Sequence, residues 1–124
     1  MDIIISNSSP VALYEQIETQ IKSQILNGKL KPLAPLPSIR TLAKELKVSI
    51  ITVKRSYEEL EKEGFIQTVI GKGTFVSGSN SERLRDAALA EMESKLEDII
   101  ISAKSMGLTL DECIEILKSI YVEV

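Results

Sequence analysis

The chain has 124 residues, 44% of them hydrophobic, so it has room for one small domain with an aliphatic core and an appendage. One cysteine, Cys113, and no histidine exclude a disulfide framework, a zinc site, histidine-based catalysis and a histidine pH switch, and no cofactor is expected. The net charge is −3, and Ile3 to Ile5 is far too short for a signal peptide or a membrane span, so we expect a soluble cytoplasmic protein that does not bind membranes.

The first predicted helix follows a short segment, Met1 to Ser8, which we expect to be frayed or to lie at an edge. Ser9-Pro10 is predicted to start the helix, because serine caps free amides and proline fits the first turn. Asn27-Gly28 is typical of a helix end. Between them an apolar residue recurs at every fourth position and gives the helix one apolar stripe: Leu13, Ile17, Ile21 and Ile25.

The second predicted helix follows a proline-rich linker. Lys31 to Pro37 contains three prolines and cannot be helical, so we interpret it as a stiff linker that leads to Ser38, the cap of this helix. The apolar face of the helix consists of Ile39, Leu42, Ala43 and Leu46. The helix is about two turns long, and Lys47-Val48 forms the turn that follows it.

A third helix is predicted to begin at Ser49, its cap, and to end at Gly64. The side chains that face inward at helical spacing are Val53, Tyr57 and Leu60. Those that point roughly the opposite way are Ile51, Arg55 and Glu58. The third helix therefore exposes a face with aliphatic and charged residues. Such a face can bind nucleic acid, but a charged face is more often only a solvent-exposed surface.

A β-hairpin is predicted after the third helix. Phe65 to Val69 and Thr74 to Ser77 are rich in β-branched and aromatic residues, and Gly71-Lys72-Gly73 forms the tip between them. Two helices joined by a tight turn and followed by a β-ribbon are typical of a winged helix-turn-helix, which lays one helix in the major groove of DNA. We therefore expect a mainly α fold with a small β-hairpin, in which residues 1–78 form a DNA-binding domain.

The distribution of charge agrees with this prediction. Residues 1–78 carry ten Lys/Arg and eight Asp/Glu, which gives +2, and residues 79–124 carry five and ten, which gives −5. Between Ser38 and Arg55 five cations stand against one anion, Glu45. Because phosphates respond to local charge, the acidic total does not argue against a nucleic-acid partner.

The last third, residues 79–124, is predicted to be a separate pair of helices. Gly78 to Ser81 is a hinge, and either Ser79, in a capping box with Glu82, or Ser81 caps a long helix. Gly107 breaks this helix, and a second capping box, Thr109 with Glu112, opens another. The long helix has a seam in 3,4,3,4,3 spacing, like that of a coiled coil: Leu89, Met92, Leu96, Ile99, Ala103 and Met106. The inward face of the last helix consists of Leu110, Cys113, Ile114, Leu117 and Tyr121.

Two amphipathic helices of this length cannot bury both faces alone, so a partner is expected. We predict a homodimer formed by this region, with the seam folding back on the winged helix as the alternative. Cys113 lies on an apolar face and is interpreted as a small hydrophobic residue rather than a redox sensor.

Motifs at fixed spacing extend from Gly28 to Val76. They are Gly28-x-Leu30-x-Pro32, Leu36-Pro37-Ser38-x-Arg40-x-Leu42-Ala43-x-x-Leu46-x-Val48-Ser49-x-x-Thr52-Val53, Leu60-Glu61-x-x-Gly64 and Gly71-x-Gly73-Thr74-Phe75-Val76. Together they resemble the DNA-binding domain of the GntR family of transcriptional regulators. The opening Leu13-Tyr14-Glu15-Gln16-Ile17 and the short two-helix tail resemble the YtrA subfamily. Relatives that carry effector or aminotransferase-like domains are much longer.

The resemblance implies a set of DNA contacts at the start of the second and third helices and at the wing tip. Arg40 can fork onto guanine or a phosphate, Lys54 can reach a phosphate, and glycines beside Lys72 let the backbone approach the minor groove. The hydroxyls of Ser49 and Thr52 stand at a helix N-terminus, where amides favour phosphate. The candidate DNA-binding residues are Ser38, Arg40, Ser49, Ile50, Ile51, Thr52, Lys54, Arg55, Gly71, Lys72 and Gly73.

The chain departs from the family pattern at three positions. Many relatives have a second arginine where this chain has Ile50, and often a polar residue in place of Ile51. A branched aliphatic side chain cannot hydrogen-bond to a base, but it can pack on a thymine methyl group. Leu33 replaces the usual turn glycine of the linker. We therefore expect an operator that differs from those of the arginine-bearing relatives.

The leading hypothesis is a homodimeric repressor that binds a pseudo-palindromic double-stranded DNA operator, and the resemblance suggests an operon such as that of an ABC transporter. A rival hypothesis is a winged helix used for protein–protein contact, with the acidic tail as the binding surface. An enzyme is excluded by the absence of histidine and of paired carboxylates in an expected cleft. Any small-molecule effector is expected at the dimer interface or between tail and winged helix.

Overall fold

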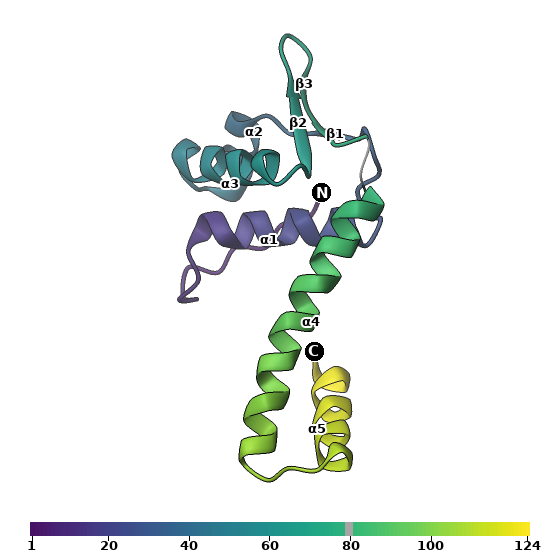
Figure 1. Cartoon of the computed structure of the whole chain (residues 1–124). Helices are drawn as coiled ribbons and strands as arrows, with labels where there is room; N and C mark the ends of the chain where they lie inside the picture. Colours follow the sequence, from purple (N-terminus) through teal and green to yellow (C-terminus); the bar gives the residue numbers. More distant parts are fainter. Residues whose placement is uncertain (79–80) are drawn as a thin grey trace. The chain divides into compact units, whose positions relative to one another are not determined.

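The computed structural model describes residues 1–78 and 81–124 (Figure 1). Within these residues the helices are α1 (Leu13–Leu26), α2 (Ile39–Leu46), α3 (Ile50–Lys62), α4 (Ser81–Ser105) and α5 (Leu110–Glu123), and the strands are β1 (Pro35–Leu36), β2 (Ile66–Val69) and β3 (Gly73–Val76). The chain divides into two compact units, Met1–Arg85 and Asp86–Val124. The division lies inside α4, and Leu84, before it, packs against the core of the first unit.

The predicted start of α1 is wrong by several residues. The helix begins at Leu13, and Ala12 occupies the N-cap without a side-chain cap. Ser9 does not cap the helix, because its Oγ accepts a hydrogen bond from the Val11 N–H at 3.2 Å and so closes a local turn. The predicted end is confirmed, since Asn27 is the C-cap and Gly28 follows it in the left-handed region at φ +82°.

The N-terminal segment is held on α1 by three glutamines spaced four residues apart. Gln20 donates to the Ile4 carbonyl at 2.7 Å and accepts from its N–H at 2.8 Å, and Gln16 makes the same pair of bonds with Ser6, each at 2.9 Å. Gln24 donates to the Asp2 carbonyl at 2.7 Å. The glutamines are four helical residues apart, a rise of about 6.0 Å, and the residues that they bind are two extended residues apart, about 6.6 Å. The spacing of the glutamines therefore matches the spacing of their partners. The expected frayed or edge segment is therefore bound along its length.

The helix-turn-helix forms as the sequence predicts, through two identical caps. Ser38 Oγ accepts from the Thr41 N–H and Ser49 Oγ from the Thr52 N–H, each at 3.1 Å. The C-cap of α2, Lys47, adopts the left-handed conformation at φ +56°, which reverses the chain into α3. The two predicted cap serines are thus confirmed.

The wing contains one more strand than the hairpin that the sequence predicts. β2 and β3 pair antiparallel, and β1 adds to the other side of β3, so the sheet order is β1-β3-β2. The predicted linker is therefore partly a strand. Pro35 is tolerated because β1 lies at the sheet edge, where no donor is required from it. Leu33 stands in the left-handed region at φ +68°. This is the position at which the family that the sequence resembles usually has a turn glycine.

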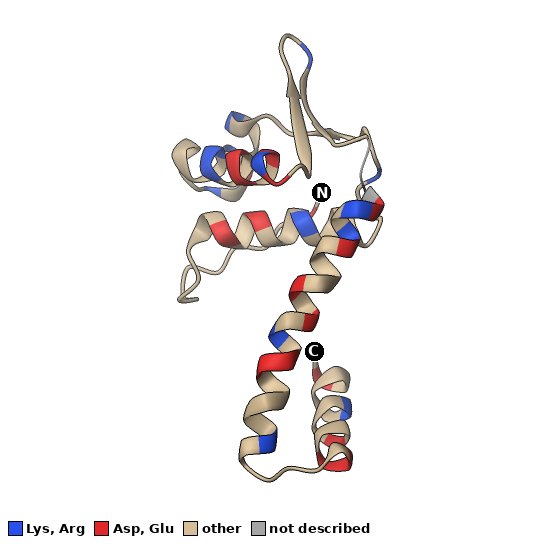
Figure 2. Cartoon of the chain, in the orientation of Figure 1, with Lys and Arg blue, Asp and Glu red and all other residues tan. Residues whose placement is uncertain are grey.

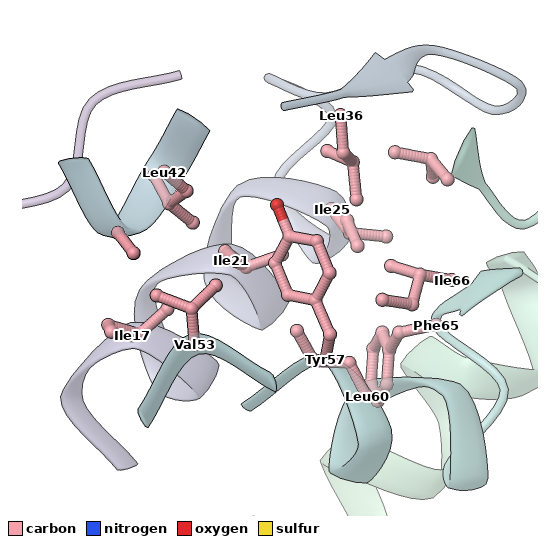
Figure 3. Packing of buried hydrophobic residues seen from close by; sticks show 12 residues of the cluster. Ile17, Ile21, Ile25, Leu36, Leu42, Val53, Tyr57, Leu60, Phe65 and Ile66 are labelled. Carbon is pink, nitrogen blue, oxygen red and sulfur yellow. The ribbon is translucent and has the colours of Figure 1, made fainter. Parts of the chain in front are cut away.

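The core of the first unit joins α1, α2, α3 and the sheet (Figure 3). The predicted inward face of α3 is buried, and so is the predicted stripe of α1 except for Leu13, which is half-buried. The buried residues of these two faces are Ile17, Ile21, Ile25, Val53, Tyr57 and Leu60. The Tyr57 hydroxyl donates to the Pro37 carbonyl at 2.7 Å, and burial raises the pKa of the Tyr57 phenol, which keeps it a neutral donor. Ser56 is the one fully buried polar residue recorded in the described part of this core.

The two helices that the sequence predicts after the wing are α4 and α5, and the second unit contains α4 from Asp86 onward and all of α5. Gly107 follows α4 in the left-handed region at φ +78°, and Thr109 and Glu112 form the predicted capping box of α5. The alternative caps of α4 fall on Ser79, which lies outside the described residues, and on Ser81, whose side chain is not described. Throughout Asp86–Val124, all of it described, Ala103 is the one buried side chain. The second unit therefore has almost no core of its own.

In residues 1–78 and 81–124, no helix combines the length and the hydropathy that a membrane crossing requires.

Candidate nucleic-acid interface

Cationic side chains gather on α2, α3 and the wing tip of the first unit (Figure 2). Arg40 stands in the first turn of α2 with an exposed side chain. The acidic residues of α3 lie in its C-terminal half, from Glu58 onward. The N-terminal half of α3 therefore lacks anions, as a surface that meets phosphates requires.

The serine and threonine hydroxyls at the two helix starts are engaged with one another. Ser38 Oγ lies 2.8 Å from Thr41 Oγ1, and Ser49 Oγ lies 2.8 Å from Thr52 Oγ1, in addition to the amide bonds of the caps. These contacts fix the orientation of each hydroxyl pair. Ser38 and Ser49 therefore cap a helix, and Thr52 is bonded to the second cap, in addition to the DNA contacts predicted for all three.

Ile50 and Ile51 lie on the surface of α3 and not in the core. Ile51 is 78% exposed, on the side of the helix opposite the buried Val53 and Leu60. Ile50, the first residue of the helix, is also exposed. The chain thus places two bare aliphatic side chains where relatives of the predicted family often carry polar ones. Aliphatic groups at this position can read a thymine methyl group but no hydrogen-bonding edge.

Lys54 and Arg55 are adjacent in sequence but have different partners. Lys54 Nζ lies 3.9 Å from a Glu58 carboxylate oxygen, and both side chains are exposed, so the pair is weak and free to exchange for a phosphate. The guanidinium carbon of Arg55 lies 3.8 Å from the centroid of the Tyr14 ring in α1. This contact cannot be predicted from periodicity, because no helical or strand spacing links residues so far apart in the chain.

The wing tip combines backbone freedom with an exposed cation. Gly71 and Gly73 have φ values of +79° and +116°, and a Cβ atom at either would meet nothing within 4 Å. The glycines are therefore required by backbone conformation and not by crowding. Lys72 is exposed between them, and Ile70, beside them, is 98% exposed. Ile70 is not among the residues predicted from the sequence to contact DNA.

The second unit carries the predicted dimerisation residues on its surface. Most of them are exposed large hydrophobic side chains: Leu89, Met92, Leu96, Ile99, Met106, Leu110, Leu117 and Tyr121. Ile114 is half-buried, and Ala103 is buried. Cys113 is a free thiol that is half-buried. An apolar surface of this extent on a small helical pair is typical of an interaction site.

Residues 13–76 match the family described as "Bacterial regulatory proteins, gntR family". The HTH-type transcriptional repressor YtrA of Bacillus subtilis is 36% identical over 122 residues, which cover 98% of this chain and 94% of that protein. YtrA from Sulfolobus acidocaldarius, a GntR-family transcription factor of solved structure, is 35% identical, with a TM-score of 0.57 and 98% of each chain covered. The solved structure of AraR(DBD) in complex with operator ORX1 is 26% identical with a TM-score of 0.55, and covers 62% of this chain and 96% of its own.

Proposed function

Since the chain belongs to the GntR family of transcriptional regulators, with a DNA-binding winged helix of YtrA type, we propose that it is a homodimeric repressor that acts on a pseudo-palindromic operator. In this proposal residues 1–78 bind DNA and residues 79–124 dimerise. The named relatives are regulators and not enzymes. The observation that carries the proposal is the exposed N-terminal half of α3, which contains no acidic residue. Cations stand on both sides of it, and the wing tip that follows is also cationic.

The proposed complex places α2, α3 and the wing tip on the DNA. The first turn of α3 enters the major groove, where Ile50 and Ile51 pack on thymine methyl groups. Arg40 contacts a guanine or a phosphate, and Lys72 and Ile70 enter the minor groove at the wing tip. The two half-sites lie about one helical turn apart, or further if the tail spreads the two winged helices. The dimer works in the cytoplasm, on an operon such as that of an ABC transporter, a target suggested by the resemblance to the YtrA subfamily.

The test of this function is footprinting and gel retardation with the purified full chain on the intergenic DNA upstream of its own gene. We expect a protected region of two related half-sites and retardation that weakens steeply as salt rises, because phosphate contacts release counterions. Absence of retardation at low salt would overturn the proposal and favour a winged helix that binds another protein.

Replacing Arg40 by alanine is expected to weaken operator binding by about 1–3 kcal/mol, the usual worth of a forked contact to guanine. Lysine at this position retains the charge but cannot form the two parallel hydrogen bonds to a guanine. Arg40→Lys therefore distinguishes a hydrogen-bonded base contact from simple attraction to a phosphate. Fluorescence anisotropy on the protected duplex and on versions with single G·C to A·T changes measures both variants. If the arginine reads a base, one of these changes costs the wild-type protein affinity and costs Arg40→Ala none. Equal weakening on every duplex would assign Arg40 to the phosphates.

Replacing Lys72 by alanine is expected to weaken binding to all sequences alike and to lower the salt slope by about one for each subunit's contact. The slope of log K against log salt concentration, measured by anisotropy at several salt concentrations, checks this result. Lys29→Ala is the matched control, because it removes the same charge from the loop after α1 in the same unit. A slope that stays at the wild-type value in Lys72→Ala contradicts the placement of the wing at the DNA.

A further inference from the structure

Tyr14 of α1 and Arg55 of α3 form a cation–π contact at the surface of the first unit. The guanidinium carbon lies 3.8 Å from the ring centroid, well inside the range in which the ring face attracts a cation. The Tyr14 hydroxyl donates to a Glu15 carboxylate oxygen at 3.1 Å, and this bond raises the pKa of the Tyr14 phenol. The ring under Arg55 therefore stays neutral. Arg55 itself is exposed and forms no salt bridge among the described residues.

A second contact, a hydrogen bond from a buried side chain, holds Tyr14 next to α3. The Ser56 hydroxyl donates to the Tyr14 carbonyl oxygen at 2.8 Å, and Ser56 has no exposed surface. Ser56 directly follows Arg55 in the chain. Because the donor side chain is fully buried, breaking this bond would leave a buried hydroxyl with one partner fewer, so the bond holds the main chain of Tyr14 beside this turn of α3. The hydrogen bond to the Tyr14 carbonyl oxygen thus keeps the ring next to Arg55.

Lys54 and Arg55 lie on opposite flanks of the exposed face of α3. At 100° per residue, Ile51 is placed between them, about 60° from Lys54 and about 40° from Arg55. Lys54 lines a surface hollow together with Thr68 and Thr74 of the wing strands, so its flank faces the wing. Arg55 rests on Tyr14, so its flank faces α1. The helix therefore carries one cation on the wing side and one on the α1 side.

We propose that Tyr14 is a positioning residue, which holds Arg55 ready to contact the DNA backbone at the edge of the exposed face of α3 that faces α1, while Lys54 stands at the edge that faces the wing. This inference rests on the proposed function, because it requires α3 to lie in the major groove. A groove is bordered by a phosphate strand on each side, so a helix within it needs a cation on each flank to be held in place. A guanidinium already stacked in a defined place loses less side-chain freedom when it binds than a free one.

The experiment compares the full-length proteins Tyr14→Phe, Tyr14→Leu, Arg55→Gln and Tyr14→Leu/Arg55→Gln with the wild type. The probes are the duplex that the wild type enriches from a random pool and an unrelated duplex of equal length. Arg55→Gln is expected to weaken both probes and to lower the salt slope by about 0.9 per contact. Tyr14→Leu is expected to weaken both about two- to fivefold, and Tyr14→Phe to retain wild-type affinity because the ring face remains. In the double variant, Tyr14→Leu is expected to cost nothing beyond Arg55→Gln.

Three outcomes would overturn the inference. A salt slope that is unchanged in Arg55→Gln would show that Arg55 does not contact a phosphate. An equal loss from Tyr14→Leu with and without Arg55 would mean that Tyr14 acts through the fold, and urea unfolding of each variant measures that loss directly. Loss of affinity in Tyr14→Phe would assign the effect to the hydroxyl. Failure of the proposed function itself differs from all three, because the wild type would then enrich no duplex.

Discussion

Replacing Ile99 by glutamate is expected to separate the proposed dimer into monomers and to weaken operator binding by about 10²–10⁴-fold, the contribution of a second linked binding site. Ile99 lies in the middle of the α4 seam and is 62% exposed on the single chain. In a two-fold interface each copy contributes the same residue, so one substitution buries two unpaired charges. Analytical ultracentrifugation measures the association state, and anisotropy on the footprinted duplex measures the affinity.

Ile101 supplies a matched control for this prediction. It is the same residue type on the same helix, is 60% exposed, and stands about 200° around the helix from Ile99. Ile101→Glu should therefore leave the dimer intact. Dissociation by Ile101→Glu together with an intact Ile99→Glu dimer would place the interface on the opposite face of α4. Two intact dimers would exclude α4 as the interface.

Replacing Ile21 by alanine is expected to lower the free energy of unfolding of the first unit by about 2–5 kcal/mol. Ile21 has no exposed surface and is the central residue of the α1 stripe that packs against α3. Small domains are stable by only about 5–15 kcal/mol, so this change removes a large share of the total. Urea unfolding at a fixed protein concentration measures it, because the stability of a dimer depends on concentration.

Ile4→Ala is the control for the core substitution, since its side chain is largely exposed while its main chain is held by Gln20. This variant should differ from wild type by no more than about 0.5 kcal/mol. If Ile21→Ala proves equally mild, α1 makes no essential contribution to the core, and the first unit would have to be held together by α2, α3 and the sheet alone.

Local signals in the sequence were sufficient for the helices and their caps. Ser38, Ser49 and Thr109 each precede an amphipathic run and cap it, because the amide N–H three residues further on donates to the hydroxyl oxygen of the serine or threonine. Ser9 fails as a cap although its local sequence is as favourable. Its hydroxyl binds the amide only two residues away, and that choice depends on how the segment before it packs on α1.

Three features that the sequence did not predict join distant parts of the chain. β1 is a two-residue strand that exists only because β3, some forty residues later, supplies its partner. The glutamines of α1 resemble ordinary surface residues until the N-terminal segment lies along them. Within the candidate site, the exposure of Ile51 followed from helical spacing, whereas the contact between Tyr14 and Arg55 requires the packing of α1 on α3.

The lack of a core in Asp86–Val124 has a consequence for how the proposed repressor responds to its own abundance. Because only Ala103 is buried there, we expect the α4 and α5 surfaces to gain most of their stability by pairing in the proposed dimer, so that active protein would form by association of two chains. Below the dissociation constant of the dimer, the number of active molecules rises with the square of the chain concentration. Halving the gene dosage in that range would therefore leave about a quarter of the active repressor, so the tail makes repression a steep function of copy number.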